Sequence, residues 1–305
     1  MAERPLVFSL PDDEAMAEEL RWQLDAERGE VVRHIFPDGE HYQRVITPVE
    51  GRRVILVGSL HDDHATLALY DLASGLVAQG ALRLELVIPY FGYSTMERAA
   101  KAGEVVTAKT RARLLSSIPR ASYGNQALLV DLHSEGIPHY FEGGLTATHV
   151  YTKAALVPAL RRLGGADFVL GSTDAGRAKW VESLANDLGV DAAFILKRRV
   201  SGSETVVQAV NAEVRGRRVV IYDDMIRTGG SLIGAARAYK DAGATSIVAV
   251  CTHGVFPPGS WERLTDSGLF NKIAATDSHP CARDLAACGL ELIPITPLLA
   301  AHLES

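Results

Sequence analysis

The residues best suited to chemistry stand together in the segment Arg217–Leu232. It opens with an apolar, β-branched run, Val219–Tyr222, which has the length and composition of a buried parallel strand. Two adjacent carboxylates, Asp223 and Asp224, follow directly. Charged groups at the carboxyl end of such a strand lie where open α/β sheets bind their ligands.

The next residues, Thr228–Ser231, predict an anion site, and we call them the phosphate loop. Their backbone N–H groups face the start of a helix-like segment near Leu232, where unpaired amides and the helix dipole favour a phosphate. Two acids for sugar hydroxyls or Mg²⁺, next to a phosphate loop, indicate a phosphoribose site. The simpler alternative is a strand–turn–helix with a solvated acidic cap, but such a turn has no need of two acids directly after a buried strand.

Three further places carry groups that suit phosphate chemistry. Lys197, Arg198 and Arg199 come directly after a predicted strand at Ala192–Leu196 and precede a Gly/Ser-bearing loop. Asp174 and His133 follow other predicted strands. A run of cations is usually a solvated face, and a single histidine at a strand end is usually structural. Their common position, at the carboxyl ends of parallel strands, favours a shared site.

Length and composition restrict the class of protein. The chain has 305 residues, 47% of them apolar, and a formal net charge of −6 without a basic stripe, which argues against a nucleic-acid partner. No run approaches the ~18 apolar residues of a membrane span, and the N-terminus lacks the build of a signal peptide. The three cysteines, Cys251, Cys281 and Cys288, predict reduced core thiols in a cytoplasmic protein.

Strand-like and helix-like segments alternate along both halves of the chain, which predicts parallel sheets covered on both faces. The second half begins after a predicted link near Gly143–His149. No sequence motif repeats between the halves. The predicted strands lie at 53–59, 127–133, 167–171, 192–196, 219–222, 246–251 and 272–275, and a further strand with its following turn lies at 84–93.

The motif D-D-M-I-x-T-G-G-S resembles the phosphoribosyl-pyrophosphate signature of type I phosphoribosyltransferases and, more closely, that of the ribose-phosphate pyrophosphokinases. P-Y-F-G-Y at Pro89–Tyr93, D-L-H at Asp131–His133 and C-T-H-G-V-F at Cys251–Phe256 also resemble this family, nearly collinearly over the chain. The resemblance implies an α/β fold of two tandem type I phosphoribosyltransferase-like domains, each a mostly parallel sheet flanked by helices. Residues 1–147 would form the ATP side and 148–305 the ribose-phosphate side.

The resemblance also implies roles for individual residues. Lys197 and Arg199 would contact the transferring diphosphoryl group, with Arg198 pointing elsewhere. Asp223 and Asp224 would hold the sugar hydroxyls. The remaining assignments are Arg227, Thr228, Gly229, Gly230 and Ser231 for the ribose phosphate, Phe36, Asp38, Glu40, Arg98 and His133 for ATP, and His133 with Asp174 for Mg²⁺.

The implied reaction transfers the β,γ-diphosphoryl group of Mg·ATP to ribose 5-phosphate, giving phosphoribosyl pyrophosphate and AMP for nucleotide biosynthesis. The implied partners are ATP and ribose 5-phosphate, with no nucleic acid and no membrane. The implied assembly is a homo-oligomer, a hexamer built from dimers.

Three departures from the family pattern leave alternatives open. Arg227 replaces an Asp, Thr95 and Met96 replace the Arg and Gln of an A-R-Q-D segment, and Thr173 replaces the Pro of S-P-D-x-G. Arg227 would suit an acceptor that bears a diphosphate, such as ADP-ribose. Loss of the Arg–Gln pair would suit a catalytically weak, regulatory paralogue of the synthetase.

The segment His61-Asp62-Asp63-His64 has two readings. Its two histidines and two aspartates could be imagined as a metal cluster. Because the segment leads into a predicted helix, capping by Asp62 or Asp63 explains the acids more simply.

Overall fold

The computed structural model describes residues 3–304 except 175, 177, 200–204 and 211–212; for 196–199 and 205–209 it describes the backbone. The chain forms two compact units. The first comprises Met1–Tyr151 and Thr296–Ser305, and the second comprises Thr152–Ile295. Within the described residues, no helix is both long enough and apolar enough to cross a membrane.

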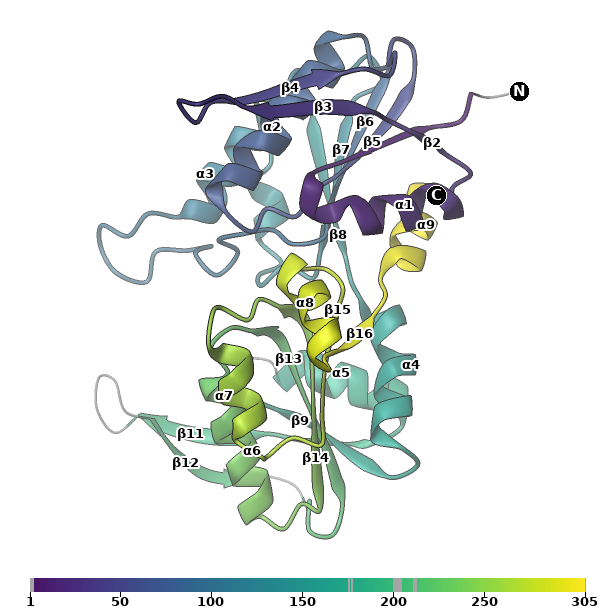
Figure 1. Ribbon diagram of the computed structural model, residues 1–305. Helices are drawn as coiled ribbons and strands as arrows, with labels where there is room; N and C mark the ends of the chain where they lie inside the picture. Colours follow the sequence, from purple (N-terminus) through teal and green to yellow (C-terminus); the bar gives the residue numbers. More distant parts are fainter. Residues whose placement is uncertain (1–2, 175, 177, 200–204, 211–212, 305) are drawn as a thin grey trace. The chain divides into compact units, whose positions relative to one another are not determined.

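The first unit contains a six-stranded parallel sheet with the order β2-β1-β5-β6-β7-β8 (Figure 1). An antiparallel hairpin, β3–β4, is inserted between β2 and β5. The strands are β1 (Leu6–Ser9), β2 (Glu27–Arg28), β3 (Val31–Ile35), β4 (His41–Val45), β5 (Arg53–Val57), β6 (Arg83–Ile88), β7 (Asn125–Val130) and β8 (Leu145–Val150).

Helices cover this sheet because its strands are apolar. Val54 and Leu56 of β5 pack with α2 (Asp63–Ala78) and α3 (Thr107–Ser116) in one core. Helix α1 (Glu14–Gln23) packs against the C-terminal helix α9 (Thr296–Glu304), which is drawn in yellow beside it in Figure 1. The guanidinium of Arg53 donates to the Leu303 carbonyl at 2.5 Å and to the buried Glu85 carboxylate at 2.6 Å, which ties α9 to β5 and β6.

The second unit contains another six-stranded parallel sheet, with the order β10-β9-β13-β14-β15-β16, and a separate hairpin, β11–β12. Its strands are β9 (Phe168–Ser172), β10 (Asp191–Ala193), β11 (Ile195–Arg199), β12 (Thr205–Val210), β13 (Arg218–Ile226), β14 (Ser246–Gly254), β15 (Lys272–Thr276) and β16 (Glu291–Ile293). Its helices are α4 (Lys153–Gly164), α5 (Ala178–Leu188), α6 (Gly230–Asp241), α7 (Ser260–Asp266) and α8 (Pro280–Leu285).

Strand β13 shows why both faces of the second sheet are covered. Val219 and Ile221 point into one core with residues of α6, whereas Val220 and Tyr222 point into the opposite core with residues of α4 and α5. Successive side chains of a strand point to opposite faces, so an uninterrupted apolar run requires helices on both sides. This confirms the prediction of parallel sheets flanked by helices.

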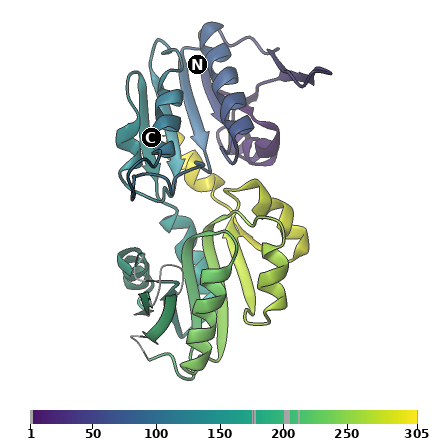
Figure 2. The same ribbon diagram turned by 90° about the vertical axis from the view of Figure 1, so that its left-hand side faces the viewer.

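The two units share one topology. In each, the first strand lies between the second and the third, a hairpin follows the second strand, and three further parallel strands complete the sheet. The hairpins β3–β4 and β11–β12 are therefore equivalent, and Figures 1 and 2 show the β3–β4 hairpin projecting from the sheet of its unit. The chain is a structural duplication, although its sequence shows no repeated motif.

Several predicted boundaries were wrong. The predicted link at Gly143–His149 is largely the edge strand β8, and the expected boundary between residues 147 and 148 falls inside it. The C-terminal helix belongs to the first unit and not to the second. Strand β13 continues through Asp223 and Asp224 to Ile226, because β14 pairs with it as far as Gly254. The three cysteines are free, but Cys288 is exposed and only Cys251 is a buried core thiol.

Gly92 is required where the chain leaves β6. Leu60 and Phe91 form an isolated parallel bridge just beyond the ends of β5 and β6, and the Leu60 amide donates to the Tyr90 carbonyl at 2.7 Å. A Cβ atom on Gly92 would lie 2.1 Å from the Leu60 carbonyl oxygen. The obstacle is backbone, so a rotamer change cannot relieve it.

We predict that Gly92→Ala lowers the free energy of unfolding by about 3 kcal/mol, because the bridge must open to admit the methyl group. Chemical denaturation measures this change. Gly75→Ala is the matched control: it lies in α2, a Cβ there meets nothing within 4 Å, and alanine should raise stability by about 0.5–1 kcal/mol. Equal stability of the Gly92→Ala protein and wild type would contradict the analysis.

Candidate active site

Asp223 and Asp224 lie at the carboxyl end of the second unit's sheet. Pairing between β13 and β9 ends at Tyr222 and Ser172, so Asp223 is the first residue of β13 beyond that pair. The two carboxyl groups interact with each other through their charges and through a side-chain hydrogen bond. Asp224 is buried and Asp223 is half-buried. The sheet thus holds two neighbouring carboxylates largely out of water.

Burial raises the pKa of Asp223, and the negative charge of Asp224 raises it further, to about 7. Hydrogen bonds from the Thr173 hydroxyl and from the Asp224 backbone act in the opposite direction. Desolvated carboxylates are costly unless hydroxyls, amides or a cation compensate them. A buried pair of carboxylates with a raised pKa, at the carboxyl end of a parallel sheet, therefore indicates a ligand site.

The phosphate loop leads from β13 into α6. Helix α6 starts at Gly230, two residues earlier than predicted, and no side chain caps its N-terminus. The first N–H groups of an α-helix have no partner within the helix, so they can bind an anion. Gly229 has a φ of 76°, and a Cβ there would lie 2.8 Å from the Leu264 side chain. Only glycine allows the loop to turn so tightly against α7.

Arg227 and Asp174 flank this loop and the acids. Arg227 is exposed, and its Nε donates to the Met225 sulfur at 3.2 Å. Asp174 follows Ser172, the last residue of β9, and its Oδ1 accepts the Gly176 amide at 2.8 Å. Since β9 and β13 are neighbours, the structure brings Asp174 and Asp223 to the same edge of one sheet, as predicted.

Two side chains hold this edge together: Thr173, noted from the sequence only as a departure from the family pattern, and Tyr239, which no sequence signal indicated. The Thr173 hydroxyl donates to Asp223 Oδ2 at 2.9 Å. The buried Tyr239 hydroxyl of α6 lies 3.0 Å from the carbonyls of Ser172 and Ala193, the last residues of β9 and β10. The only signal in the sequence was Thr173 standing next to Asp174, because the register of β9 against β13 is not visible there.

Lys197 and Arg199 lie within a strand and do not follow one, which corrects the prediction. The predicted strand Ala192–Leu196 is two strands, β10 and β11, and all three cations belong to β11 of the β11–β12 hairpin. Strand β10 pairs with β9, with Ala193 opposite Gly171, so β11 begins at the carboxyl edge of the sheet. The side chains of Lys197 and Arg199, and the loop 200–204, lie outside the described residues.

Phe36, Asp38 and Glu40 gather at the tip of the β3–β4 hairpin in the first unit. Phe36 is 42% exposed and makes edge contacts with His34 and Tyr42. Asp38 Oδ1 accepts the Glu40 amide at 3.2 Å, which closes the turn at Gly39. The tip therefore offers an exposed aromatic ring next to two acids, the combination expected of a contact to a nucleotide base and ribose.

The other two residues predicted to bind ATP lie on separate segments of the first unit. Arg98 is 83% exposed in its side chain and pairs with Glu97 at 3.5 Å. His133 is half-buried and follows β7 by three residues, since that strand ends at Val130 and not at His133 as predicted. His133 thus belongs to the first unit, whereas Asp174, its predicted partner for Mg²⁺, belongs to the second.

A dedicated metal cluster is absent from the described part of the chain: no group of three or more His, Cys, Asp or Glu side chains there could hold a metal ion. At His61–His64 the capping interpretation is confirmed. Asp62 Oδ1 accepts the Ala65 amide at 2.7 Å and caps α2.

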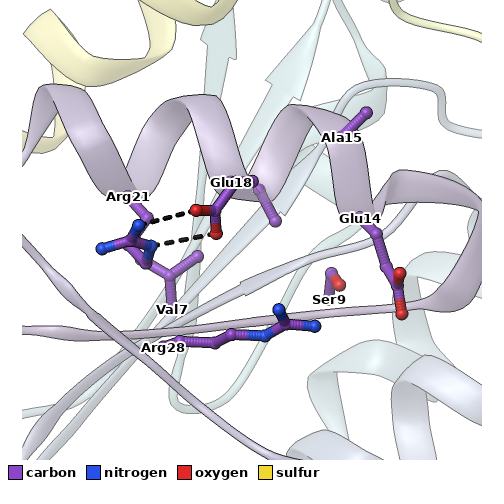
Figure 3. Close-up of a pocket in the computed structure, with 8 residues that line it drawn as sticks. Val7, Ser9, Glu14, Ala15, Glu18, Arg21 and Arg28 are labelled. Carbon is purple, nitrogen blue, oxygen red and sulfur yellow. Dashed lines mark hydrogen bonds and ion pairs between the residues drawn. The ribbon is translucent and has the colours of Figure 1, made fainter.

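A cavity in the first unit lies apart from all of these residues. It has a volume of ≈ 300 Å³ and is lined by α1, β1 and β2 (Figure 3). Arg21 and Glu18 bind each other there through two hydrogen bonds of 2.9 and 2.6 Å. Since each neutralises the other, this cavity is a poor match for the polyanion that the sequence predicts.

Comparison with known proteins agrees with the fold and with the sequence motifs. Residues 6–118 match the family model of the N-terminal domain of ribose phosphate pyrophosphokinase, and residues 164–270 match that of the phosphoribosyl transferase domain. The chain is 30% identical to the ribose-phosphate pyrophosphokinase of Ralstonia nicotianae over 97% of its own length and 92% of the relative. It is 31% identical to that of Synechococcus elongatus over 96% and 88%.

Among solved structures, the chain is similar to the phosphoribosylpyrophosphate synthetase of Mycobacterium smegmatis. The TM-score is 0.87 at 25% identity, covering 99% of this chain and 98% of that one. Both matched family models, the relatives matched over almost their full length and this structural likeness agree. The chain belongs to the ribose-phosphate pyrophosphokinase family.

Proposed function

We propose that the protein transfers the β,γ-diphosphoryl group of Mg·ATP to the 1-hydroxyl of ribose 5-phosphate. The hydroxyl oxygen forms a bond to the β-phosphorus and loses its proton to solvent, the bond from that phosphorus to the bridging oxygen of the α-phosphate breaks, and AMP leaves with that oxygen. The observation that carries the proposal is the desolvated pair Asp223–Asp224 directly before the phosphate loop. Family membership supports the same reaction.

In this proposal the two acids and the phosphate loop bind different parts of the acceptor. The carboxylates accept hydrogen bonds from sugar hydroxyls, and the uncapped N-terminus of α6 receives the 5-phosphate. Lys197 and Arg199 neutralise charge on the transferring group. In such a transfer, alignment of the reactants and charge neutralisation supply most of the catalysis.

Mg²⁺ is part of the proposal, and the available ligands suit it. Mg²⁺ is typically held by one or two carboxylates together with substrate phosphates and water. A three-residue cluster is therefore not needed, which agrees with its absence among the described residues. Asp174 is the carboxylate that we assign to the ion. When bound, the ion would neutralise phosphate oxygens.

The donor nucleotide is assigned to the first unit. The exposed Phe36 ring, with Asp38 and Glu40 on the same hairpin tip, supports adenosine recognition. Arg98 is exposed and its only described ion pair is a solvated one with Glu97, so it can turn to a phosphate at little cost. We expect the site to be completed in a homo-oligomer.

Incubation of the purified protein with Mg·ATP and ribose 5-phosphate, followed by phosphorus NMR, tests the reaction. AMP and phosphoribosyl pyrophosphate should form in equal amounts. Release of ADP would indicate transfer of a single phosphoryl group, and absence of AMP would support the regulatory paralogue. A parallel assay with ADP-ribose tests the alternative acceptor that Arg227 suggested.

We predict that Lys197→Ala reduces kcat by about 10²–10³-fold, the usual effect of removing one preorganised group that stabilises developing charge. Steady-state assays of AMP release measure it. Arg198→Ala is the matched control, as it removes a cation from the neighbouring position of β11 and should retain most activity. Turnover of the Lys197→Ala enzyme within a few-fold of wild type would remove Lys197 from the catalytic role.

We predict that Asp223→Asn stabilises the ligand-free protein at pH 8 by about 2 kcal/mol. The pKa of Asp223 is raised in the folded state, to about 7, above its ordinary value near 4. Ionisation therefore opposes folding, and stability falls as the pH rises from about 4 to 7. The asparagine variant lacks this loss, so its advantage should vanish near pH 4.

Denaturation curves from pH 4 to 8 measure this difference. Asp284→Asn, which removes an exposed carboxylate of α8, is the control and should show no pH-dependent advantage. An Asp223→Asn protein that is equally stable or less stable than wild type at pH 8 would contradict the prediction.

A further inference from the structure

Thr173 and Asp223 are direct neighbours across the carboxyl edge of the second sheet. Ser172 and Tyr222 form the last residue pair between β9 and β13. Thr173 comes directly after the end of β9, and Asp223 comes next within β13. The Thr173 hydroxyl donates to Asp223 Oδ2 at 2.9 Å. Thr173 is only 2% exposed, so packing restricts its side chain, and its branched Cβ restricts it further.

The Asp223 carboxylate is held at both oxygens. Thr173 binds Oδ2, and the Asp224 amide donates to Oδ1 at 3.0 Å. A carboxylate oxygen can accept more than one hydrogen bond, so these two contacts do not by themselves prevent the carboxylate from binding a ligand hydroxyl. With one contact at each oxygen, rotation of the carboxylate about its side-chain bond is restricted.

The first unit contains a similar contact between a hydroxyl and a carboxylate, but the two groups come from the opposite strands. There the buried Asp13, which follows β1, accepts the Ser59 hydroxyl and amide, both at 2.7 Å, from the segment after β5. In the first unit the carboxylate follows the first strand of the sheet and the hydroxyl follows the third. In the second unit the hydroxyl follows the first strand and the carboxylate lies on the third. In the second unit the acid consequently lies on the strand that leads into the phosphate loop.

We propose that Thr173 is a positioning residue that holds the Asp223 carboxylate in the orientation needed to bind the hydroxyls of the acceptor sugar. This inference deepens the proposed function and rests on it. Thr173 itself does not touch the reacting atoms. Its hydroxyl acts through Asp223, so its loss should weaken acceptor binding far more than it slows the chemical step.

Thr173→Val is the direct test, since valine keeps the branched shape and removes the hydroxyl. We expect the KM for ribose 5-phosphate to rise about tenfold, the usual scale for losing one hydrogen bond to a charged group. The KM for ATP and kcat should change by less than about threefold. Thr173→Ser, which restores a hydroxyl, should return the KM for ribose 5-phosphate to near the wild-type value.

Thr252→Val is the control for loss of a buried hydroxyl in the same unit. Thr252 is fully buried and its hydroxyl contacts the Tyr222 hydroxyl at 2.8 Å. This variant should lose stability and keep the KM for ribose 5-phosphate. An equal rise in KM in Thr252→Val, an unchanged KM in Thr173→Val, or failure of Thr173→Ser to restore binding would each overturn the proposal.

Calorimetric titration with ribose 5-phosphate and Mg²⁺ separates this proposal from the reaction itself. If wild type releases no AMP, the proposed function fails, and the titration still compares sugar-phosphate binding by wild type and Thr173→Val. Wild-type binding that is about tenfold tighter supports the role of Thr173. Equal binding, or no binding by wild type, overturns it.

Discussion

Two carboxylates lie next to each other where β13 leaves the second sheet, and the structure keeps them from water. Burial and mutual repulsion raise the pKa of Asp223 to about 7, so in the ligand-free protein the ionised pair opposes folding. The fold can bear this loss of stability because apolar cores on both faces of the sheet hold β9, β13 and α6 in place independently of the two acids. In the proposed function, the hydroxyls of the acceptor sugar or a cation would compensate this buried charge further.

The duplicated topology explains how one fold could serve two halves of a reaction. Each unit has the same strand order and carries a hairpin after its second strand. In the first unit that hairpin bears Phe36, Asp38 and Glu40, and in the second it bears Lys197 and Arg199. Equivalent projections thus carry an aromatic and acidic set in one unit and a cationic set in the other. In the proposed function the first set contacts a nucleoside and the second contacts phosphates, so the proposed division of roles depends on side chains and not on backbone topology.

The same contrast holds at the sheet edges. In the first unit Asp13 is fully buried and accepts the hydroxyl and the amide of Ser59, so the contact joins two buried segments. In the second unit Thr173 supplies the hydroxyl and Asp223 the acid, which leaves the carboxylate beside the phosphate loop. Tyr239 fastens the ends of β9 and β10 to α6, so the loop, the acids and the start of the β11–β12 hairpin are fixed to one another.

The fold class, the parallel strands, the acid pair and the Gly-rich turn after it were predictable from the sequence, because apolar runs of strand length and a Gly-rich turn are local signals. It could not give the end of β13, the strand nature of 145–150 or the return of α9 to the first unit, since these depend on pairing and packing between distant segments. Thr173 shows most clearly which contacts cannot be predicted from the sequence. Its hydroxyl lies within reach of Asp223 only because β9 and β13 pair in one register, and a register is decided by the assembled sheet and not by either strand alone.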